Sequence, residues 1–224
     1  MAEISYRPYQ EGDAEDVTRI LIEAMNIHRF VQGERLRHTL ADAYRCERLL
    51  ASSFTQVAVQ DGRTLGIVMG HVTGVPRLPG RFRHRLRSAW LTVLAGVLGF
   101  RQWKSLARYA GFEAVYRRLR ATHASQIPNE LTLFAVDAST RGHGVGTHLY
   151  ASFTRHLEKR RQHSFFLFTD DTLSYRFYEK MGMTRRGTAP HSVLLDGQLT
   201  DIEVYLYTHD LTGQSRSAPS QGEH

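Results

Sequence analysis

The sequence predicts an α/β fold with a mixed, mostly antiparallel sheet of six or seven strands flanked by helices. Two short β-type runs separated by Asp61-Gly62 indicate an antiparallel hairpin, because both turn residues tolerate positive φ. A strand, a glycine-rich loop and an amphipathic helix follow one another from residue 130. The 224 residues, 42% of them apolar, are enough to bury the core of a single domain.

The first third of the chain alternates between strands and amphipathic helices. Residues 4–7 alternate like a strand, and residues 17–25 carry apolar side chains on one helical face. Residues 34–50 read as a second amphipathic helix. The hairpin strands are expected at 54–60 and 64–72. Both helices should therefore lie on the surface of a sheet.

A basic helical insertion is expected at about 75–127, within a single domain that spans residues 1–211. Residues 77–120 hold eleven arginines and lysines against the single acid Glu113, a formal charge of +10. The apolar run 89–100 is too short to span a bilayer. It could cover a pocket, join two subunits in a homodimer or lie on a membrane. A helical flap with a solvated basic side is the simplest interpretation.

The second half of the chain contains the most informative unit. A strand at 130–137 leads into the glycine loop, and the helix after it has apolar residues at every fourth position from Val145. A buried strand at 164–168 and a short helix ending at Gly182 follow, and then a terminal hairpin within 193–207. The polar, aperiodic tail 212–224 is expected to be disordered.

The glycine loop has the properties of an anion site. The first turn of a helix leaves backbone N–H groups unpaired and carries the positive end of the helix dipole. Small residues allow a pyrophosphate to approach those groups. Arg141 would add a positive charge beside the phosphates, and Val145 would point inward and anchor the helix on the sheet. The candidate cofactor-binding residues are Arg141, Gly142, His143, Gly144, Val145 and Gly146. Neither a Walker loop nor a Gly-x-Gly-x-x-Gly sequence is present.

The context of this loop resembles the GCN5-related N-acetyltransferase (GNAT) family, including a bacterial subgroup with a similar inserted segment. Residues 141–146 match the family pattern Q/R-x-x-G-x-G/A at every defined position, and the segment from Tyr178 to Gly182 matches its second motif. The resemblance implies acetyl-CoA as cosubstrate. It also implies a strand that splays from its neighbour, with the pantetheine arm beside Phe134 and Val136.

The same resemblance assigns catalytic roles. It places Tyr178 where the family has the tyrosine that faces the CoA sulfur and acts as general acid, although a core role is the alternative. The usual glutamate position is Thr132 here, and the nearest acid is Glu130. Alternation with a period of two would put Glu130, Thr132, Phe134 and Val136 on one face, so Glu130 is a candidate general base. A solvated strand-end carboxylate is the alternative for Glu130.

Composition sets further limits. The formal charge of +7 permits an anionic partner but does not choose one. Cys46 is the only cysteine and the histidines lack ligand spacing, so no metal site is expected. Neither a signal segment nor a transmembrane segment is evident, which favours the cytoplasm.

Two functions from different classes remain open. The first is an acetyl-CoA-dependent N-acetyltransferase acting on a primary amine of a small molecule or protein, by direct attack in a ternary complex. The second is a noncatalytic acyl-CoA-binding sensor, or a nucleic-acid-binding module that uses the basic insertion, although no nucleic-acid motif is recognisable.

Overall fold

A seven-stranded sheet with the order β1-β2-β3-β4-β5-β7-β6 forms the centre of the protein in the computed structural model, which describes residues 3–140 and 142–212. Every neighbouring pair is antiparallel except β4 and β5, which are parallel, so the predicted mixed sheet is confirmed. The strands are β1 Ser5–Arg7, β2 Phe54–Gln60, β3 Arg63–His71, β4 Glu130–Val136, β5 Ser164–Asp170, β6 Thr184–Leu195 and β7 Gln198–Asp210.

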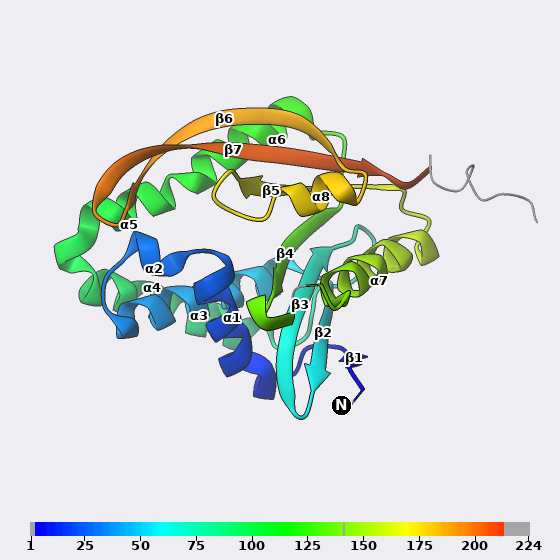
Figure 1. Ribbon diagram of the computed structural model, residues 1–224, viewed down its shortest axis with the longest axis horizontal. Coiled ribbons are helices and arrows are strands. Elements are labelled where there is room, and N and C mark those ends of the chain that lie inside the picture. Colours follow the sequence, from blue (N-terminus) through cyan, green and yellow to red (C-terminus); the bar gives the residue numbers. More distant parts are fainter. Residues whose placement is uncertain (1–2, 141, 213–224) are drawn as a thin grey trace, which may run out of the picture.

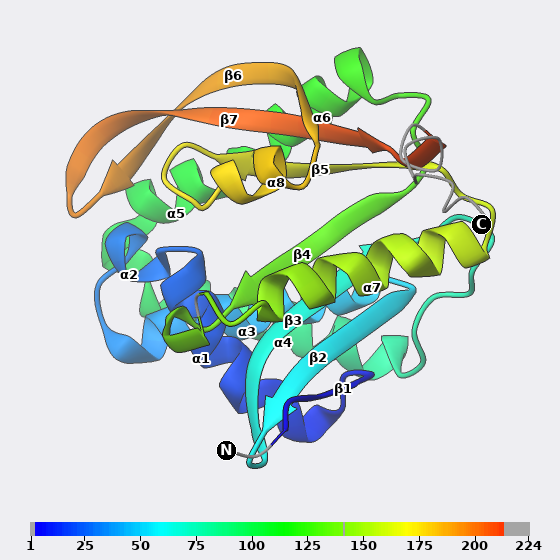
Figure 2. The same ribbon diagram turned by 45° about the vertical axis from the view of Figure 1, so that its right-hand side comes forward.

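Helices cover both faces of the sheet (Figures 1 and 2). They are α1 Ala14–Ala24, α2 Ile27–Phe30, α3 Glu34–Ala51, α4 Arg81–Leu98, α5 Trp103–Ala110, α6 Phe112–His123, α7 Val145–Lys159 and α8 Arg176–Lys180. Three short 3₁₀ helices connect these elements. They are η1 Glu11–Asp13 before α1, η2 Phe100–Gln102 between α4 and α5, and η3 Ala138–Thr140 after β4. None of these helices is long and apolar enough to span a bilayer.

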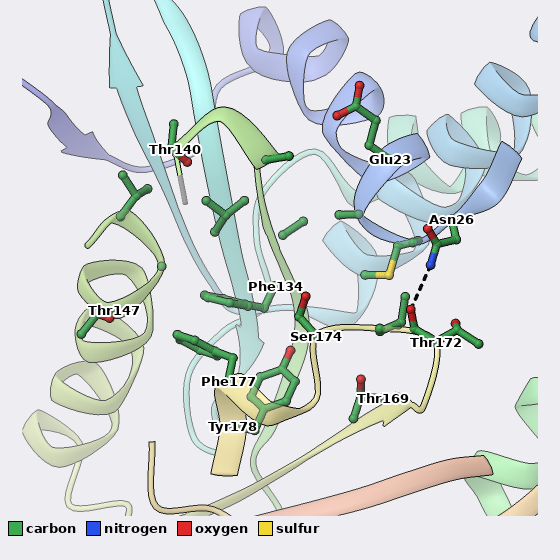
Figure 3. Close-up of a pocket in the computed structure, with 18 of the residues that line it drawn as sticks. Glu23, Asn26, Phe134, Thr140, Thr147, Thr169, Thr172, Ser174, Phe177 and Tyr178 are labelled. Atoms are coloured by element: carbon green, nitrogen blue, oxygen red, sulfur yellow. Dashed lines mark hydrogen bonds between the residues drawn. The ribbon is translucent and has the colours of Figure 1, made fainter. Parts of the chain in front are cut away.

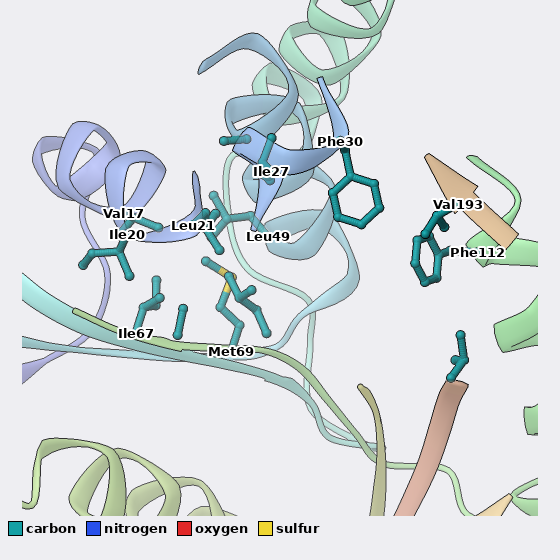
Figure 4. Packing of buried hydrophobic residues seen from close by; sticks show 14 of the residues in the cluster. Val17, Ile20, Leu21, Ile27, Phe30, Leu49, Ile67, Met69, Phe112 and Val193 are labelled. Carbon is teal, nitrogen blue, oxygen red and sulfur yellow. The ribbon is translucent and has the colours of Figure 1, made fainter. Parts of the chain in front are cut away.

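Two buried apolar clusters hold the layers together. On one face, Val17 and Leu21 of α1 pack with Ile67 and Met69 of β3 (Figure 4). On the other face, Phe153 of α7 packs in a second cluster with residues of β3 and β5. The two clusters bury the apolar faces that the sequence periodicity predicted for α1 and α7.

Two-residue turns with positive φ close both hairpins. Asp61 and Gly62 join β2 to β3 with φ of 51° and 76°, and Asp196 and Gly197 join β6 to β7 with φ of 54° and 80°. The terminal strands extend beyond the predicted hairpin at 193–207, since β6 already begins at Thr184 and β7 ends at Asp210. Most side chains in the first half of β6 are exposed, so no apolar alternation marks that half in the sequence.

The inserted helices α4, α5 and α6 lie between β3 and β4 in the chain and supply part of the core. Helix α4 packs on α3, and α5 and α6 pack on β6, with α6 also contacting β7. Ala95, Phe112 and Leu119 of these helices are buried in the same cluster as α1 and α3. Removing the insertion would therefore uncover the core, which a loosely attached flap would not do.

Strands β4 and β5 touch only at one end. Their single paired position is Glu130 with Phe166, where the Phe166 amide donates to the carbonyl of Asn129 at 3.1 Å. The buried Asn129 side chain fixes this junction by accepting from the Thr73 amide and donating to the Ser164 carbonyl, both at 2.9 Å. Beyond it the strands diverge, as Figure 2 shows. The split expected from the family resemblance is present.

A bulge in β4 corrects one sequence prediction. The register against β3 shifts between Met69, opposite Leu133, and Gly70, opposite Leu131, which leaves Thr132 as the extra residue. Thr132 faces α3, where its hydroxyl lies 2.7 Å from that of Ser52, whereas Phe134 packs in the α7 cluster. The prediction that Glu130, Thr132, Phe134 and Val136 share a face is therefore wrong.

Candidate active site

A cleft of about 610 Å³ occupies the gap between the diverging strands β4 and β5. Figure 3 shows residues that line it, which come from α1, β4, α7, α8 and the loop after β5. Its walls include the glycine loop at one end, Phe134 and Val136 of β4 in the middle, and Thr169, Ser174, Phe177 and Tyr178 opposite. The strand separation therefore creates a cleft beside the edge of β4, which does not pair with β5 beyond Glu130.

The glycine loop forms one end of this cleft. Gly142 and Gly144 have φ of 82° and 75°, and a Cβ built on either would meet nothing within 4 Å. Gly144 is the N-cap of α7, so the N–H groups of Val145, Gly146 and Thr147 have no acceptor within the helix. Open space, backbone donors and the helix dipole coincide at this end, which suits a phosphate group.

Two other residues of the glycine loop differ in their exposure to solvent. Val145 is 1% exposed and anchors α7 in the core, as its predicted inward position requires. His143 is exposed, is absent from the cleft wall, and donates its amide to the Thr140 carbonyl at 3.2 Å. Arg141 lies outside the described residues.

Gly146 lies where α7 meets β4 and α8. A Cβ there would make ordinary contacts, at 3.4 Å from the Phe134 ring, 3.6 Å from Val136 and 3.7 Å from Phe177. Phe134 and Phe177 stack with ring centroids 5.0 Å apart. These contacts join α7, β4 and α8 into one wall of the cleft.

An ion pair holds the start of the loop. Arg19 of α1 donates to Asp137, just after β4, at 2.7 Å, and the Ser139 hydroxyl donates to the same carboxylate at 2.7 Å. Burial opposes ionisation of Asp137, but these hydrogen bonds outweigh it and lower its pKa to about 2. The carboxylate therefore stays charged and ties the loop to α1.

Tyr178 lies across the cleft from the loop. It is 9% exposed, and its ring meets Phe134 edge to face at 6.1 Å. The Tyr178 and Ser174 hydroxyls point into the space beside Phe134 (Figure 3). Burial, and secondarily the nearby Tyr44, raises the pKa of Tyr178, so its hydroxyl keeps its proton at neutral pH. A group in this state can donate a proton.

The comparisons with known proteins agree with this geometry. Residues 16–183 match the model of the acetyltransferase (GNAT) family. The chain belongs to that family. No match was found among curated proteins.

Solved structures of other proteins share the fold at low identity. A protein assigned to the GNAT family from Desulfovibrio desulfuricans is 15% identical with a TM-score of 0.53, covering 93% of this chain and 99% of its own. Ard1 from Thermoplasma volcanium is 17% identical with a TM-score of 0.52, covering 93% and 97%. A Pyrococcus horikoshii protein is 12% identical with a TM-score of 0.57, covering 93% and 98%. These similarities show the fold alone.

A second cavity of about 400 Å³ adjoins the GNAT cleft, and Tyr44, Tyr116, Met25 and Leu173 line both. Its wall includes five aromatic side chains, three of them from the insertion, and three carboxylates. The aromatic residues are Phe30, Tyr44, Tyr109, Phe112 and Tyr116, and the acids are Glu47, Glu113 and Asp170. No local sequence pattern links Tyr44 with Tyr116, because 72 positions separate them in the chain.

Asp170 is the most buried of these acids, at 5% exposed. The amide and hydroxyl of Thr172 donate to its Oδ1 at 2.9 and 2.5 Å. Burial raises the pKa of Asp170 despite these bonds. Among the described residues, no basic side chain lies within ion-pair distance of it. Asn26 donates to the Thr172 carbonyl at 3.1 Å and so links the α1–α2 turn to this loop.

Glu130 lies at the closed end of the split and is not part of the cleft wall. Burial raises the pKa of Glu130, and the positive charge of Arg48 is the largest opposing influence. The Arg48 guanidinium is 3.4 Å from Glu113 and 4.9 Å from the centre of the Tyr44 ring. Glu130 therefore belongs to a charged cluster behind Tyr44, on the side of the second cavity.

The described residues contain no group of three or more histidine, cysteine or acidic side chains placed to hold a metal ion.

Proposed function

We propose that this GNAT protein transfers the acetyl group of acetyl-CoA to a primary amine that binds in the second cavity. The cleft between β4 and β5 supports this most strongly, because it joins the glycine loop to the Tyr178 hydroxyl in one continuous space. The loop N–H groups and the α7 dipole would hold the pyrophosphate. The open backbone edge at Phe134 and Val136 would hold the pantetheine arm, and Arg141 and His143 remain further candidates for phosphate contact.

The acceptor is proposed to approach from the cavity side. Tyr44 and Tyr116 line both spaces, so an amine bound among the aromatic side chains of the second cavity would reach the acetyl group between them. Aromatic faces attract cations, and a buried carboxylate without an ionic partner is stabilised by a cation that binds beside it. Asp170 would therefore attract the ammonium form, and the apolar wall would accept an aromatic or alkyl body.

Starting from the bound ammonium, the nitrogen gives up two protons and the departing sulfur takes one. The ammonium first loses a proton to a carboxylate, which releases it to solvent. The neutral nitrogen then forms the new C–N bond as the thioester C–S bond breaks, the sulfur takes the proton of Tyr178, and the second proton of the nitrogen restores the Tyr178 hydroxyl. Glu130 is the proposed base. Since it lies behind Tyr44, it would act through a water molecule, and its raised pKa improves it as a proton acceptor near neutral pH.

An amine panel tests this proposal. The protein is incubated with acetyl-CoA and either 2-phenylethylamine, tryptamine, ethanolamine or a lysine peptide, and free thiol is measured over time. The two arylalkylamines are expected to give the highest kcat/KM. Asp170→Asn should raise the KM for these amines by roughly 10-fold or more, since it removes a buried charge partner, and should leave acetyl-CoA affinity unchanged.

The outcomes separate the parts of the proposal. Turnover with ethanolamine and the peptide but not with the arylalkylamines would contradict the acceptor class alone. Acetyl-CoA binding without acetylation of any amine would contradict the catalytic assignment.

A further inference from the structure

An exposed apolar stripe runs along the outer face of α4, and exposed aromatic residues of η2 and of the start of α5 follow it in the chain. Seven of the eight large apolar side chains that are exposed among the described residues belong to it, with exposed fractions of 56–74%. We name this set the α4 stripe: Phe82, Leu86, Trp90, Val93, Val97, Phe100 and Trp103. The eighth, Leu199, lies near the β6–β7 turn. Soluble proteins usually leave apolar side chains scattered singly, so this concentration requires an explanation.

Helical geometry makes the stripe continuous within α4. Its α4 members are separated by three or four residues, which places them on one side of the helix at about 100° per residue. Ser88 and Ala95, the buried residues of α4, lie on the opposite side, where α4 packs on α3. The stripe therefore points away from the core. It also takes no part in the acceptor cavity, to which α4 contributes Thr92, Ala95 and Gly96.

Positive charge flanks the stripe. At about 100° per residue, Arg83 falls on one edge and Arg85 on the other, and both are exposed. Arg101 and Lys104 continue the basic character past the end of α4, and no acidic residue occurs between positions 77 and 112. Residues outside the 77–120 segment have 18 basic and 21 acidic side chains, a formal charge of −3 against +10 for the segment. The basic character of the protein is therefore concentrated in the insertion.

We propose that the α4 stripe docks the protein on an anionic phospholipid surface. An amphipathic helix with Trp, Phe and Leu on one face and arginines beside it lies in the interface of a bilayer, with its apolar side chains at the boundary between headgroups and acyl chains. The flanking arginines extend toward lipid phosphates. A second copy of the chain fits less well, because twofold pairing of α4 would bring two basic, acid-free segments together.

Both tryptophans of the chain, Trp90 and Trp103, lie in the stripe. Intrinsic fluorescence of the intact protein therefore reports docking without a label. Vesicles of phosphatidylcholine mixed with equal phosphatidylglycerol are expected to shift the emission to shorter wavelength and to protect it from an aqueous quencher. Vesicles of phosphatidylcholine alone should do neither, and added salt should reverse the shift. Unchanged emission with the anionic vesicles would overturn the proposal.

Variants identify the surface responsible. Combined Trp90→Ser, Val93→Ser and Val97→Ser should lower partitioning onto anionic vesicles, measured by co-sedimentation, by roughly 10-fold or more. Arg83→Glu with Arg85→Glu should do the same. Leu199→Ser is the matched control, because Leu199 is 61% exposed on a different part of the fold, and its partitioning should not change.

All these substitutions are at exposed positions, so each variant should keep the melting temperature of the unaltered protein. Equal partitioning of the triple-serine variant and the Leu199→Ser control would overturn the proposal. So would light scattering that finds a dimer which only the triple-serine variant dissociates, since the stripe would then join two copies of the chain. The test is independent of acetyl transfer, because it needs neither acetyl-CoA nor an amine.

Discussion

Gly144→Val is expected to abolish measurable acetyl-CoA binding. Gly144 has φ of +75°, where a β-branched residue is rarely found, and it lies on the cleft wall as the N-cap of α7. A Cβ at this position would meet nothing within 4 Å. The valine methyl groups would therefore project into the space in front of the first helical turn, where the pyrophosphate is proposed to bind.

The expected loss follows from the hydrogen bonds at stake. A hydrogen bond to a charged group contributes about 1.5–3 kcal/mol, so losing two weakens binding by about 3 kcal/mol at the least, or roughly 100-fold. The left-handed backbone conformation costs an L-residue about 1–2 kcal/mol of stability. The variant should consequently be somewhat less stable, and its folding must be verified before titration.

Gly74→Val separates the two effects. Gly74 has φ of +78°, also has nothing within 4 Å of a built Cβ, and lies outside the cleft wall. Calorimetric titration should find normal acetyl-CoA affinity for Gly74→Val, despite a similar loss of stability, and none for Gly144→Val. Unchanged affinity in Gly144→Val, or equal losses in both variants, would refute the assignment of the phosphate loop.

Three further predictions concern the chemistry and the scaffold. Tyr178→Phe should keep acetyl-CoA affinity but lower kcat by roughly 10 to 10,000-fold. The control, Tyr150→Phe, removes a buried hydroxyl 2.6 Å from His209 and should lower stability only. Full activity of Tyr178→Phe would mean that Tyr178 has only a packing role. Because burial raises the pKa of Glu130 above 4.5 and only the carboxylate accepts a proton, kcat/KM should fall as pH decreases through that pKa. Glu130→Gln should lower kcat/KM and remove this acid limb, and an unchanged limb would exclude Glu130 as the base. Asp137→Asn should lower the melting temperature at pH 7. Since the folded pKa of Asp137, about 2, is below the usual 3.8, the difference in melting temperature between the variant and the unaltered protein should shrink as pH falls from 3.8 through 2. A difference independent of pH would argue against the Arg19–Asp137 pair.

Local signals explain what could be predicted. Asp61-Gly62 specifies its turn through positive φ at both positions, and Gly144 marks the start of α7 through its own left-handed φ. Tyr178 is found in the cleft wall because its motif fixes its distance from the strand before it. Each of these features depends on residues close together in the chain.

Features set by distant contacts could not be predicted. The bulge at Thr132 arises from the register of β4 against β3, and it moves Glu130 to the side of α3. Asn129 acquires its role only when Thr73 and Ser164 meet at the junction of the split. The strand propensities of β4 contain no signal for either effect, since both depend on tertiary pairing.

Mass-resolved single turnover tests the central claim most directly. The protein, in excess over acetyl-CoA, is mixed with 2-phenylethylamine, and CoA thiol and N-acetylated amine are quantified together. The proposed function predicts that both products appear at equal rates and in equal amounts, and that neither forms at an appreciable rate when the amine is omitted. Thiol release without N-acetylated amine, or no reaction with any amine of the panel despite acetyl-CoA binding, would contradict it.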